Sequence, residues 1–218
     1  MSTPRFHIPV PLTLATTLNL PEAAAHHAAR VLRLRSGDAV TLFNGQGGEY
    51  AARITAIGKH DVTVAIERHD PVERESPLPV TLVQALSSGE RMDLTIQKAV
   101  ELGVSRIVPV ESERSVVRLK GERAGKRVAH WQQVVVSACE QCGRNRIPEV
   151  RMISPLDVWL AAEENESQRW VLLPGADTAL RDLPRPQKPV ELLVGPEGGL
   201  TDAEADAYWA TRPRVSQL

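Results

Sequence analysis

The sequence predicts an α/β protein with two domains, a small β-rich domain followed by a larger domain built on a parallel sheet. Residues 1–70 contain short strand patterns separated by glycine-rich turns. Residues 71–79 are rich in proline and charge, as linkers are. Residues 80–218 alternate apolar strands with amphipathic helices, which is typical of a parallel sheet covered on both faces. The 218 residues, 42% of them hydrophobic, suffice for one large or two modest domains.

Alternating hydrophobicity and tight turns define the first domain. Val62, Val64 and Ile66 alternate with small or polar residues, so one face of that strand is expected to be buried. The turns "GQGG" and "GKHD" predict hairpins, and the short strands together predict a small barrel. An alanine-rich helix over 21–34 begins with a proline suited to a first helical turn. The expected strands are 5–10, 39–44, 49–57 and 62–68.

The second domain shows strand and helix patterns in alternation. In the first helix, Met92, Ile96, Ala99 and Val100 form one apolar stripe, and Gly103 is the expected C-terminal stop. The second helix carries the stripe Val128, Trp131, Val135, Ala138 and Cys142. The expected helices are 90–103 and 124–143, and the expected strands are 80–86, 104–110, 169–175 and 190–195.

The stretch "GPEGG", residues 195–199, follows the last of these apolar strands. Ligands of open α/β sheets bind beyond the carboxyl ends of the strands, and glycines let the backbone approach a ligand closely. Pro196 and Glu197 make the loop stiff and polar, which suits a neutral or cationic group. Thr201 and Glu204 then form a capping box for a following helix. The spacing is neither a P-loop nor a dinucleotide fingerprint, and a plain tight turn is the alternative.

Basic residues gather in the middle of the chain. Residues 91–151 contain 12 Lys/Arg and 7 Asp/Glu, although the whole chain has a net charge of −1. Such a cluster indicates either a polyanion-binding face or a salt-bridged surface. Within it, "ESERSVVRLKGERAGKR" reads as a surface loop that either contacts phosphates or is merely solvated.

Two cysteines in the motif "CEQC" raise a different possibility. A C-x-x-C pair is compatible with redox chemistry or with half of a zinc site, but a second pair of ligands with zinc spacing is missing. Cys142 falls on the apolar stripe of its helix, so buried small residues are the favoured interpretation. With no signal-peptide pattern and no apolar run near the roughly 18 residues of a membrane span, a soluble cytoplasmic protein is expected.

Several blocks together resemble the small-subunit (16S) ribosomal RNA uridine N3-methyltransferases of the SPOUT superfamily. They are "LLVGPEGGLTDAE", "QKAVELGVSRIVPVESERSVV", "ACEQCGRNRIPEV" and "HHAARVLRLRSGDAVTLFNGQGGEY". The resemblance implies a PUA-like barrel over 1–70, a SPOUT domain over 80–218 with a C-terminal trefoil knot, S-adenosylmethionine as methyl donor, no metal, a homodimer and ribosomal RNA as partner. The family continues with a block like R-I-L-R-x-E-T-A, whereas this sequence ends at Leu218, so the cofactor pocket of these residues is expected to be incomplete.

The local chemistry and the resemblance together suggest roles for residues. Uracil N3 must lose its proton before methylation, which requires a base or cations that stabilise the anion. The expected catalytic residues are Arg144, Glu140 and Gln141. The expected cofactor-binding residues are Leu173, Pro174, Val194, Gly195, Pro196, Glu197, Gly198 and Gly199. The expected RNA-binding residues are Arg5, Arg114, Arg118, Lys120 and Arg123.

Two alternatives stay open from the residues themselves. Arg144 and Arg146 also suit a purely structural role, because they lie where cations complement the negative end of a helix. An RNA-binding protein without catalysis is the second hypothesis for the whole chain. Aromatic residues are only 4% of the sequence, so RNA affinity is expected to depend on charge and shape rather than on stacking.

Overall fold

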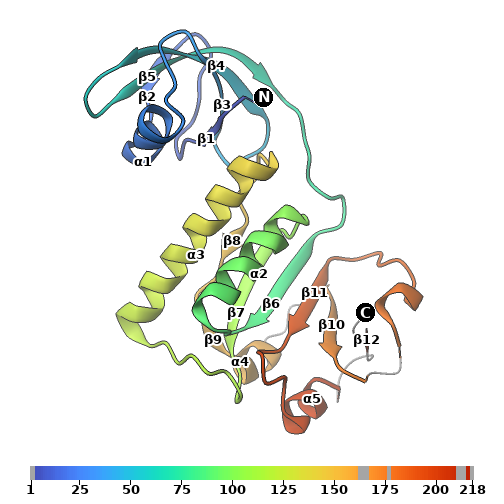
Figure 1. The fold of residues 1–218 in the computed structure, drawn as a ribbon. Helices are drawn as coiled ribbons and strands as arrows, with labels where there is room; N and C mark the ends of the chain where they lie inside the picture. Colours follow the sequence, from blue (N-terminus) through green and yellow to red (C-terminus); the bar gives the residue numbers. More distant parts are fainter. Residues whose placement is uncertain (1–2, 162–166, 176–177, 210–214, 217–218) are drawn as a thin grey trace. The chain divides into compact units, whose positions relative to one another are not determined.

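The computed structural model describes residues 3–161, 167–175, 178–209 and 215–216, which fall into two compact units (Figure 1). Unit 1 comprises Met1–Glu75 and Val136–Ile147. Unit 2 comprises Ser76–Val135 and Pro148–Leu218. The predicted boundaries at 70 and 80 stay predictions, and the predicted knot falls in a region in which 210–214 and 217–218 lie outside the described residues.

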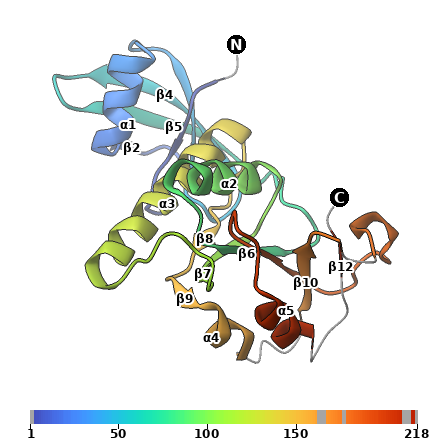
Figure 2. The same ribbon diagram turned by 60° about the horizontal axis from the view of Figure 1, so that its bottom comes forward.

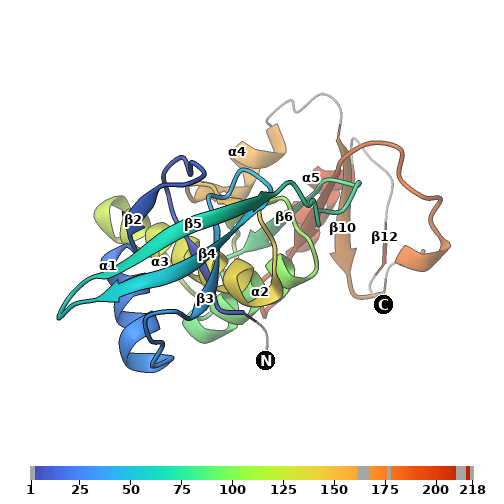
Figure 3. The ribbon, with the colours of Figure 1, turned by 90° about the horizontal axis from the view of Figure 1, so that it is seen from above.

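Unit 1 is built on one sheet with the strand order β1-β3-β4-β5-β2. β4 and β5 form a long antiparallel hairpin (Figure 3), and β1 pairs with β3 in parallel. Glycines 45, 47 and 48 all have positive φ, as the predicted β3–β4 turn requires. The strands are β1 (Arg5–His7), β2 (Thr17–Asn19), β3 (Ala39–Phe43), β4 (Glu49–Ile57) and β5 (Val62–Asp70).

A short helix covers the core of unit 1. α1 (Glu22–His26) continues directly into η1 (His27–Val31), a turn of π-helix. The predicted helix is therefore present, and its second half has the wider π-helical winding. Ala25 and Ala28 from this segment are buried against Phe6, Leu42 and Val64. The alternating residues of the hairpin strand, Val62, Val64 and Ile66, are buried as predicted.

Unit 2 is built on a parallel sheet with the strand order β12-β10-β11-β6-β7-β8, and β9 also pairs with β7. Every pairing among the described strands of this sheet is parallel, which confirms the predicted α/β class. The strands are β6 (Val80–Ala85), β7 (Arg106–Glu111), β8 (Glu149–Val150), β9 (Ser154–Pro155), β10 (Gln168–Leu173), β11 (Val190–Val194) and β12 (Val215–Ser216).

Helices pack on both faces of this sheet (Figure 2). α4 (Leu156–Ala161) and α5 (Asp202–Trp209) cover one face, where Trp159 and Tyr208 pack with Val83, Val171 and Leu193. α2 (Gly89–Glu101) and α3 (Gly121–Cys142) lie on the opposite side. Gly103, with φ +96°, ends the α2 segment as predicted. The short 3-10 turn η2 (Leu180–Asp182) precedes β11.

The long helix corrects one prediction. Trp131, Val135 and Ala138 of α3 are buried, as the apolar stripe predicts. Cys142 is exposed instead, and Cys139 is the buried cysteine. The predicted stripe extends one turn too far, because α3 ends at Cys142 and its last turn is not covered on that side.

A buried ion pair joins β10 and β11. The Nε of Arg169 lies 2.6 Å from a carboxylate oxygen of Glu191, and the two side chains are 2% and 3% exposed. Arg169 also stacks 4.5 Å from the ring centroid of Trp159 and donates to the Leu160 carbonyl. Removing one partner of a buried pair leaves a desolvated charge without its counter-ion, which is more costly than never having had the pair.

We therefore expect Glu191→Ala to lower the free energy of unfolding by about 3–5 kcal/mol. Urea denaturation followed by circular dichroism measures this, with an unchanged slope showing that the folded state is otherwise intact. The matched control is Glu149→Ala, because Glu149 pairs with Arg151 at the surface, where their side chains are 59% and 49% exposed. That change is expected to cost less than about 1 kcal/mol. Equal losses of stability in both variants would contradict the role given to the buried pair.

Candidate functional site

The loop 195–199 turns sharply at the end of β11. The Gly199 N–H donates to the Pro196 carbonyl at 2.9 Å, and Gly199 has φ +71°, which favours glycine. A side-chain carbon at Gly195 would lie 3.2 Å from the Leu200 nitrogen. Gly195 and Gly199 therefore both require a residue without a side chain, and the loop exposes its backbone at these positions.

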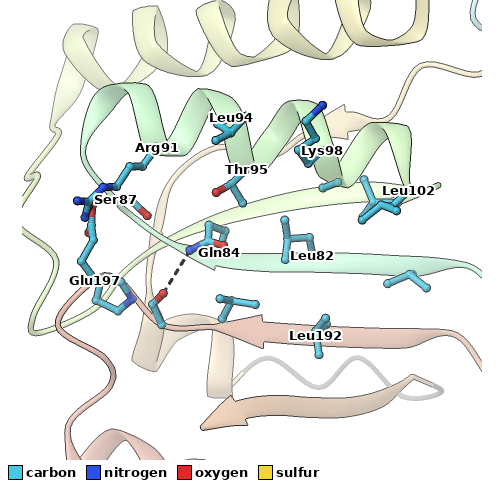
Figure 4. Close-up of a pocket in the computed structure, with 16 residues that line it drawn as sticks. Leu82, Gln84, Ser87, Arg91, Leu94, Thr95, Lys98, Leu102, Leu192 and Glu197 are labelled. Carbon is cyan, nitrogen blue, oxygen red and sulfur yellow. Dashed lines mark hydrogen bonds and ion pairs between the residues drawn. The ribbon is translucent and has the colours of Figure 1, made fainter. Parts of the chain in front are cut away.

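The ends of three parallel strands meet at this loop. The register places Leu172 of β10 beside Val194 of β11, and Val194 beside Gln84 of β6. Of the predicted cofactor residues, Leu173 ends β10 and Pro174 follows it, at the same sheet edge where residues 195–199 follow β11. Gln84 is buried, and its amide nitrogen donates to the carbonyls of Gly195 at 3.3 Å and Ala85 at 3.0 Å (Figure 4).

Glu197 turns toward the start of α2. Its carboxylate accepts from the Ser88 backbone N–H at 3.0 Å and the Ser88 hydroxyl at 2.9 Å, and lies 3.3 Å from Arg91. The backbone N–H of Ser88, followed by that of Glu197 itself, lowers the pKa of the Glu197 carboxyl to about 2. Because Ser88 immediately precedes the helix, this anion also complements the positive helix N-terminus.

The segment after β7 is attached to the same loop. Arg114 donates to the carbonyls of Gly198 and Leu200, each at 3.1 Å. The predicted capping box is present, since Glu204 accepts from the Thr201 N–H at 2.9 Å. The Glu204 carboxylate also accepts from the Glu113 N–H at 2.8 Å.

The other predicted RNA-binding residues of this segment differ in their surroundings. Arg118 is held by Glu111 at 2.7 Å and by the Glu113 carbonyl at 2.8 Å. Lys120 and Arg123 are exposed, and within the described part of the chain neither takes part in an ion pair. Arg114 is thus fixed to the loop, while Lys120 and Arg123 are available to solvent.

A groove of about 690 Å³ runs from this loop along α2 (Figure 4). One end is polar and includes Gln84, Arg91 and Glu197. The rest is mostly apolar, apart from Thr95 and Lys98. Leu94 of α2 and Leu102, the residue that follows α2, are 55% and 87% exposed.

The predicted cofactor residues divide between the two sides of the sheet. Those that line the groove are Val194, Gly195, Pro196 and Glu197. Leu173 packs instead with the core beneath α4 and α5, because side chains alternate along a strand. Leu173 and residues 194–197 therefore lie on opposite faces of the sheet and come together only at its carboxyl edge.

The predicted catalytic residues lie in unit 1, at the end of α3 and just beyond it. Arg144 is buried and forms a bidentate pair with Glu75, one bond being 3.0 Å from its Nε. The Glu140 carboxylate accepts from the His7 N–H at 2.9 Å, and burial raises the pKa of that carboxyl. Gln141 is exposed.

Arg5 is also held within unit 1. It lies 2.6 Å from Glu49 and donates to the side-chain oxygen of Asn145 at 2.6 Å. Its side chain is 13% exposed. The structure therefore places Arg5 and Arg144 in internal contacts that the sequence did not reveal, since the acidic partners are distant along the chain.

The cysteines and the possible metal ligands give no competing site in the described residues. Burial raises the pKa of the Cys139 thiol to about 12, so Cys139 is a thiol and not a reactive thiolate at neutral pH. Within the described ranges no group of three or more His, Cys, Asp or Glu residues is arranged to hold a metal ion. No helix among the described residues is long and apolar enough to cross a membrane.

Three residues that support the loop, Gln84, Ser88 and Arg91, were not predicted from the sequence. Gln84 carried a signal, because it is the polar residue at the carboxyl end of an otherwise apolar strand pattern, "VTLVQAL". Ser88 stands before a helix, where an N-cap is expected. Nothing local connects either residue to a loop more than 100 positions away.

Comparison with known proteins agrees with this architecture. Residues 74–212 match the RNA methyltransferase domain family, and residues 20–67 match the RNA methyltransferase PUA domain family. The ribosomal RNA small subunit methyltransferase E of Buchnera aphidicola subsp. Schizaphis graminum is 32% identical over 93% of this chain and 82% of its own length.

Solved structures agree at the level of the whole fold. The ribosomal RNA small subunit methyltransferase E of Neisseria gonorrhoeae, bound to S-adenosyl methionine, is 41% identical with a TM-score of 0.93, over 100% of this chain and 89% of that chain. A Legionella pneumophila protein in complex with the bound cofactor SAM is 38% identical with a TM-score of 0.93, over 100% and 90%. The chain therefore belongs to the family of ribosomal RNA small subunit methyltransferase E.

Proposed function

We propose that this protein transfers a methyl group from S-adenosylmethionine to N3 of a uridine in 16S ribosomal RNA. The observation that carries the proposal is the meeting of loop 195–199 with the ends of β10 and β6 in a chain of this family. The similar Neisseria gonorrhoeae protein is described as bound to S-adenosyl methionine. The uridine N3 position rests on the family resemblance of the sequence.

The residues at the sheet edge fit such a cofactor. Bound there, it supplies a methyl group on a positively charged sulfur. The backbone at Gly199 can approach a flat ring closely, because no atom beyond its chain neighbours lies within 4 Å of where its side chain would begin. Leu173 and Val194 supply apolar walls from the two faces, and Pro174 follows β10 at the same edge. Pro196, buried, keeps the loop stiff.

Glu197 acts in this proposal as a positioning residue. Its carboxylate is occupied by Ser88 and Arg91, so it holds the loop against α2 and sets where the glycine backbone lies. Gln84 and Arg114 do the same from the other side by binding loop carbonyls. Preorganised backbone contributes to binding because less freedom is lost when the ligand arrives.

Glu140, Gln141 and Arg144 are the proposed residues for the nucleoside. A carboxyl with a raised pKa is suited to accept the N3 proton, and burial raises that of Glu140. Gln141 is exposed and can pair with the edge of a uracil. Arg144, held by Glu75, contributes a fixed positive charge. The proposed RNA contacts are Arg5, Arg114, Arg118, Lys120 and Arg123. Lys120 and Arg123 are the most accessible, because both are exposed and neither is held by an ion pair or a side-chain hydrogen bond in the described chain.

The direct test is transfer of labelled methyl from S-adenosylmethionine to small ribosomal subunits or to 16S ribosomal RNA. We expect incorporation, with 3-methyluridine as the labelled nucleoside after digestion and mass spectrometry. The assay is run on the 218 residues and on a version extended by the block that the resemblance leads us to expect beyond Leu218. RNA binding without transfer would favour the non-catalytic alternative.

A second prediction separates positioning from direct contact at Glu197. Glu197→Ala is expected to weaken binding of S-adenosylmethionine about tenfold, or about 1.4 kcal/mol, in calorimetry. Glu197→Gln keeps an acceptor for Ser88 and is expected to retain most of the affinity. In a double-mutant cycle, Glu197→Ala and Arg91→Met are expected to be non-additive, as for residues in contact. Additive effects, or a loss in Glu197→Gln equal to that in Glu197→Ala, would indicate direct contact with the cofactor.

The pKa of the Glu197 carboxyl defines the pH range over which its contacts with Ser88 and Arg91 contribute. Its folded pKa, about 2, lies below the ordinary 4.5, so its contribution is complete above about pH 5 and is lost as the pH falls toward 2. The roughly tenfold effect of Glu197→Ala is therefore expected to stay constant between about pH 6 and 9.

We also propose a cytoplasmic homodimer. Exposed Leu94 and Leu102 give α2 an apolar surface of the kind that protein partners cover. Sedimentation at micromolar concentration is expected to show a dimer, and Leu94→Glu with Leu102→Glu is expected to shift it to a monomer. The control is Val158→Glu, a charge at another exposed apolar residue of unit 2. A wild-type monomer would contradict the proposal.

A further inference from the structure

The positively charged side chains of unit 1 are either paired with carboxylates or take part in no ion pair. Most of its arginines are tied to acidic side chains within the unit, which leaves little charge for a partner. The paired arginines are Arg5, Arg53, Arg68, Arg74, Arg144 and Arg146. In the described part of unit 1, the cations that take part in no ion pair are Arg30, Arg33, Arg35 and Lys59.

These unpaired cations come from neighbouring parts of the unit. Arg30, Arg33 and Arg35 belong to one stretch, "RVLRLR", which ends η1 and leads toward β3. Lys59 lies in the β4–β5 turn, and it lines the same cavity of about 240 Å³ as Arg30. Arg30 and Lys59 therefore lie close together, and Arg33 and Arg35 follow Arg30 along the chain.

The same stretch exposes apolar side chains. Val31 is 62% exposed and Leu32 is 41% exposed, between the exposed Arg30 and Arg33. Apolar side chains flanked by unpaired arginines offer both a surface for bases and donors for phosphates.

The backbone of this stretch is strained. Arg33 has φ +54°, the left-handed conformation that usually falls to glycine at a helix end. The chain closes the turn with the Leu32 N–H on the His27 carbonyl at 2.9 Å and the Leu34 N–H on the Ala28 carbonyl at 3.0 Å. An arginine where glycine would cost less indicates that the side chain is needed for something other than folding.

The acidic neighbours decide how a partner would bind. Glu22 and Asp61 line the cavity together with Arg30 and Lys59, so the cavity itself carries no net positive charge when His26 and His60 are neutral. A small anion enclosed in the cavity is thus disfavoured. Arg33 and Arg35 do not line the cavity and are both exposed, so they add positive charge outside it. The acidic neighbour at that end is Asp38, whose carboxylate accepts from the Arg35 N–H at 2.7 Å. That arrangement suits an extended polyanion lying across the surface.

We propose that Arg30, Val31, Leu32, Arg33, Arg35 and Lys59 form a strand-binding surface for RNA, which we call the RVLRLR surface. The cations contact phosphates, and Val31 and Leu32 support bases or riboses. The inference rests on the proposed RNA substrate, but it does not depend on methyl transfer. It adds to the contact proposed for Arg5, whose side chain is paired with Glu49.

The test measures binding of a 16S ribosomal RNA transcript without cofactor, as a function of salt. The triple variant Arg30→Gln, Arg33→Gln, Arg35→Gln is expected to lower the slope of log affinity against log salt by about 2 to 3, because each neutralised phosphate contributes about one to that slope. The control is Arg68→Gln, which removes an exposed unit 1 arginine that is paired with Asp70. Its slope is expected to stay at the wild-type value.

Two further variants separate function from folding. Arg33→Gly relieves the left-handed backbone, so its melting temperature is expected not to fall while its RNA affinity falls. Val31→Ser with Leu32→Ser is expected to weaken binding without changing the salt slope. A triple variant with the slope of the wild type would overturn the proposal. So would full affinity for naked RNA combined with loss of binding to assembled subunits, because that result would point to a ribosomal protein as the partner.

Discussion

The parallel register between β6, β11 and β10 is the constraint on which the rest of unit 2 depends. In a parallel sheet every strand ends at the same edge, so the segments that follow these strands are brought together although they are far apart in the sequence. Residues 173–174 and 195–199 become neighbours in this way, and Gln84 reaches the loop from the strand beside them. The backbone hydrogen bonds between the strands bring these segments together, and the side-chain contacts then fix their detailed positions.

Ion pairs decide which charges remain available to a partner. Arg144 and Arg5 are paired with Glu75 and Glu49, so they stabilise the arrangement of unit 1 before any substrate arrives. Lys120, Arg123 and the RVLRLR surface keep their charges exposed. Whether an arginine can bind a partner therefore depends on its contacts in the folded protein, and the sequence motif alone does not show them.

Local patterns predicted most of the fold. The strand alternation at Val62–Ile66, the stripe of α2 and the stop at Gly103 depend on residues close in sequence, and the structure confirms them. The end of α3 was harder to predict because burial of Cys142 depends on what covers the helix, and nothing does on that side in the described chain. The short strand β2 lacked a readable pattern, since three residues give too little alternation.

The candidate site was predictable in its location but not in its contacts. The glycine spacing and the capping box located the loop, and the family resemblance supplied its proposed ligand. The partner of Glu197 lies 109 positions away and that of Arg144 lies 69 positions away, so no local rule connects them. Composition also cannot tell a cation with an acidic partner from a cation without one.

One carboxylate joins two of these segments. Glu204 starts α5 by binding Thr201 and at the same time accepts from the Glu113 N–H, while Arg114 holds the carbonyls of Gly198 and Leu200. Neither segment can leave its place without breaking bonds made by the other. Residues 113–114 and 198–204 therefore form one cooperative unit of local unfolding, whose amide protons exchange together rather than loop by loop.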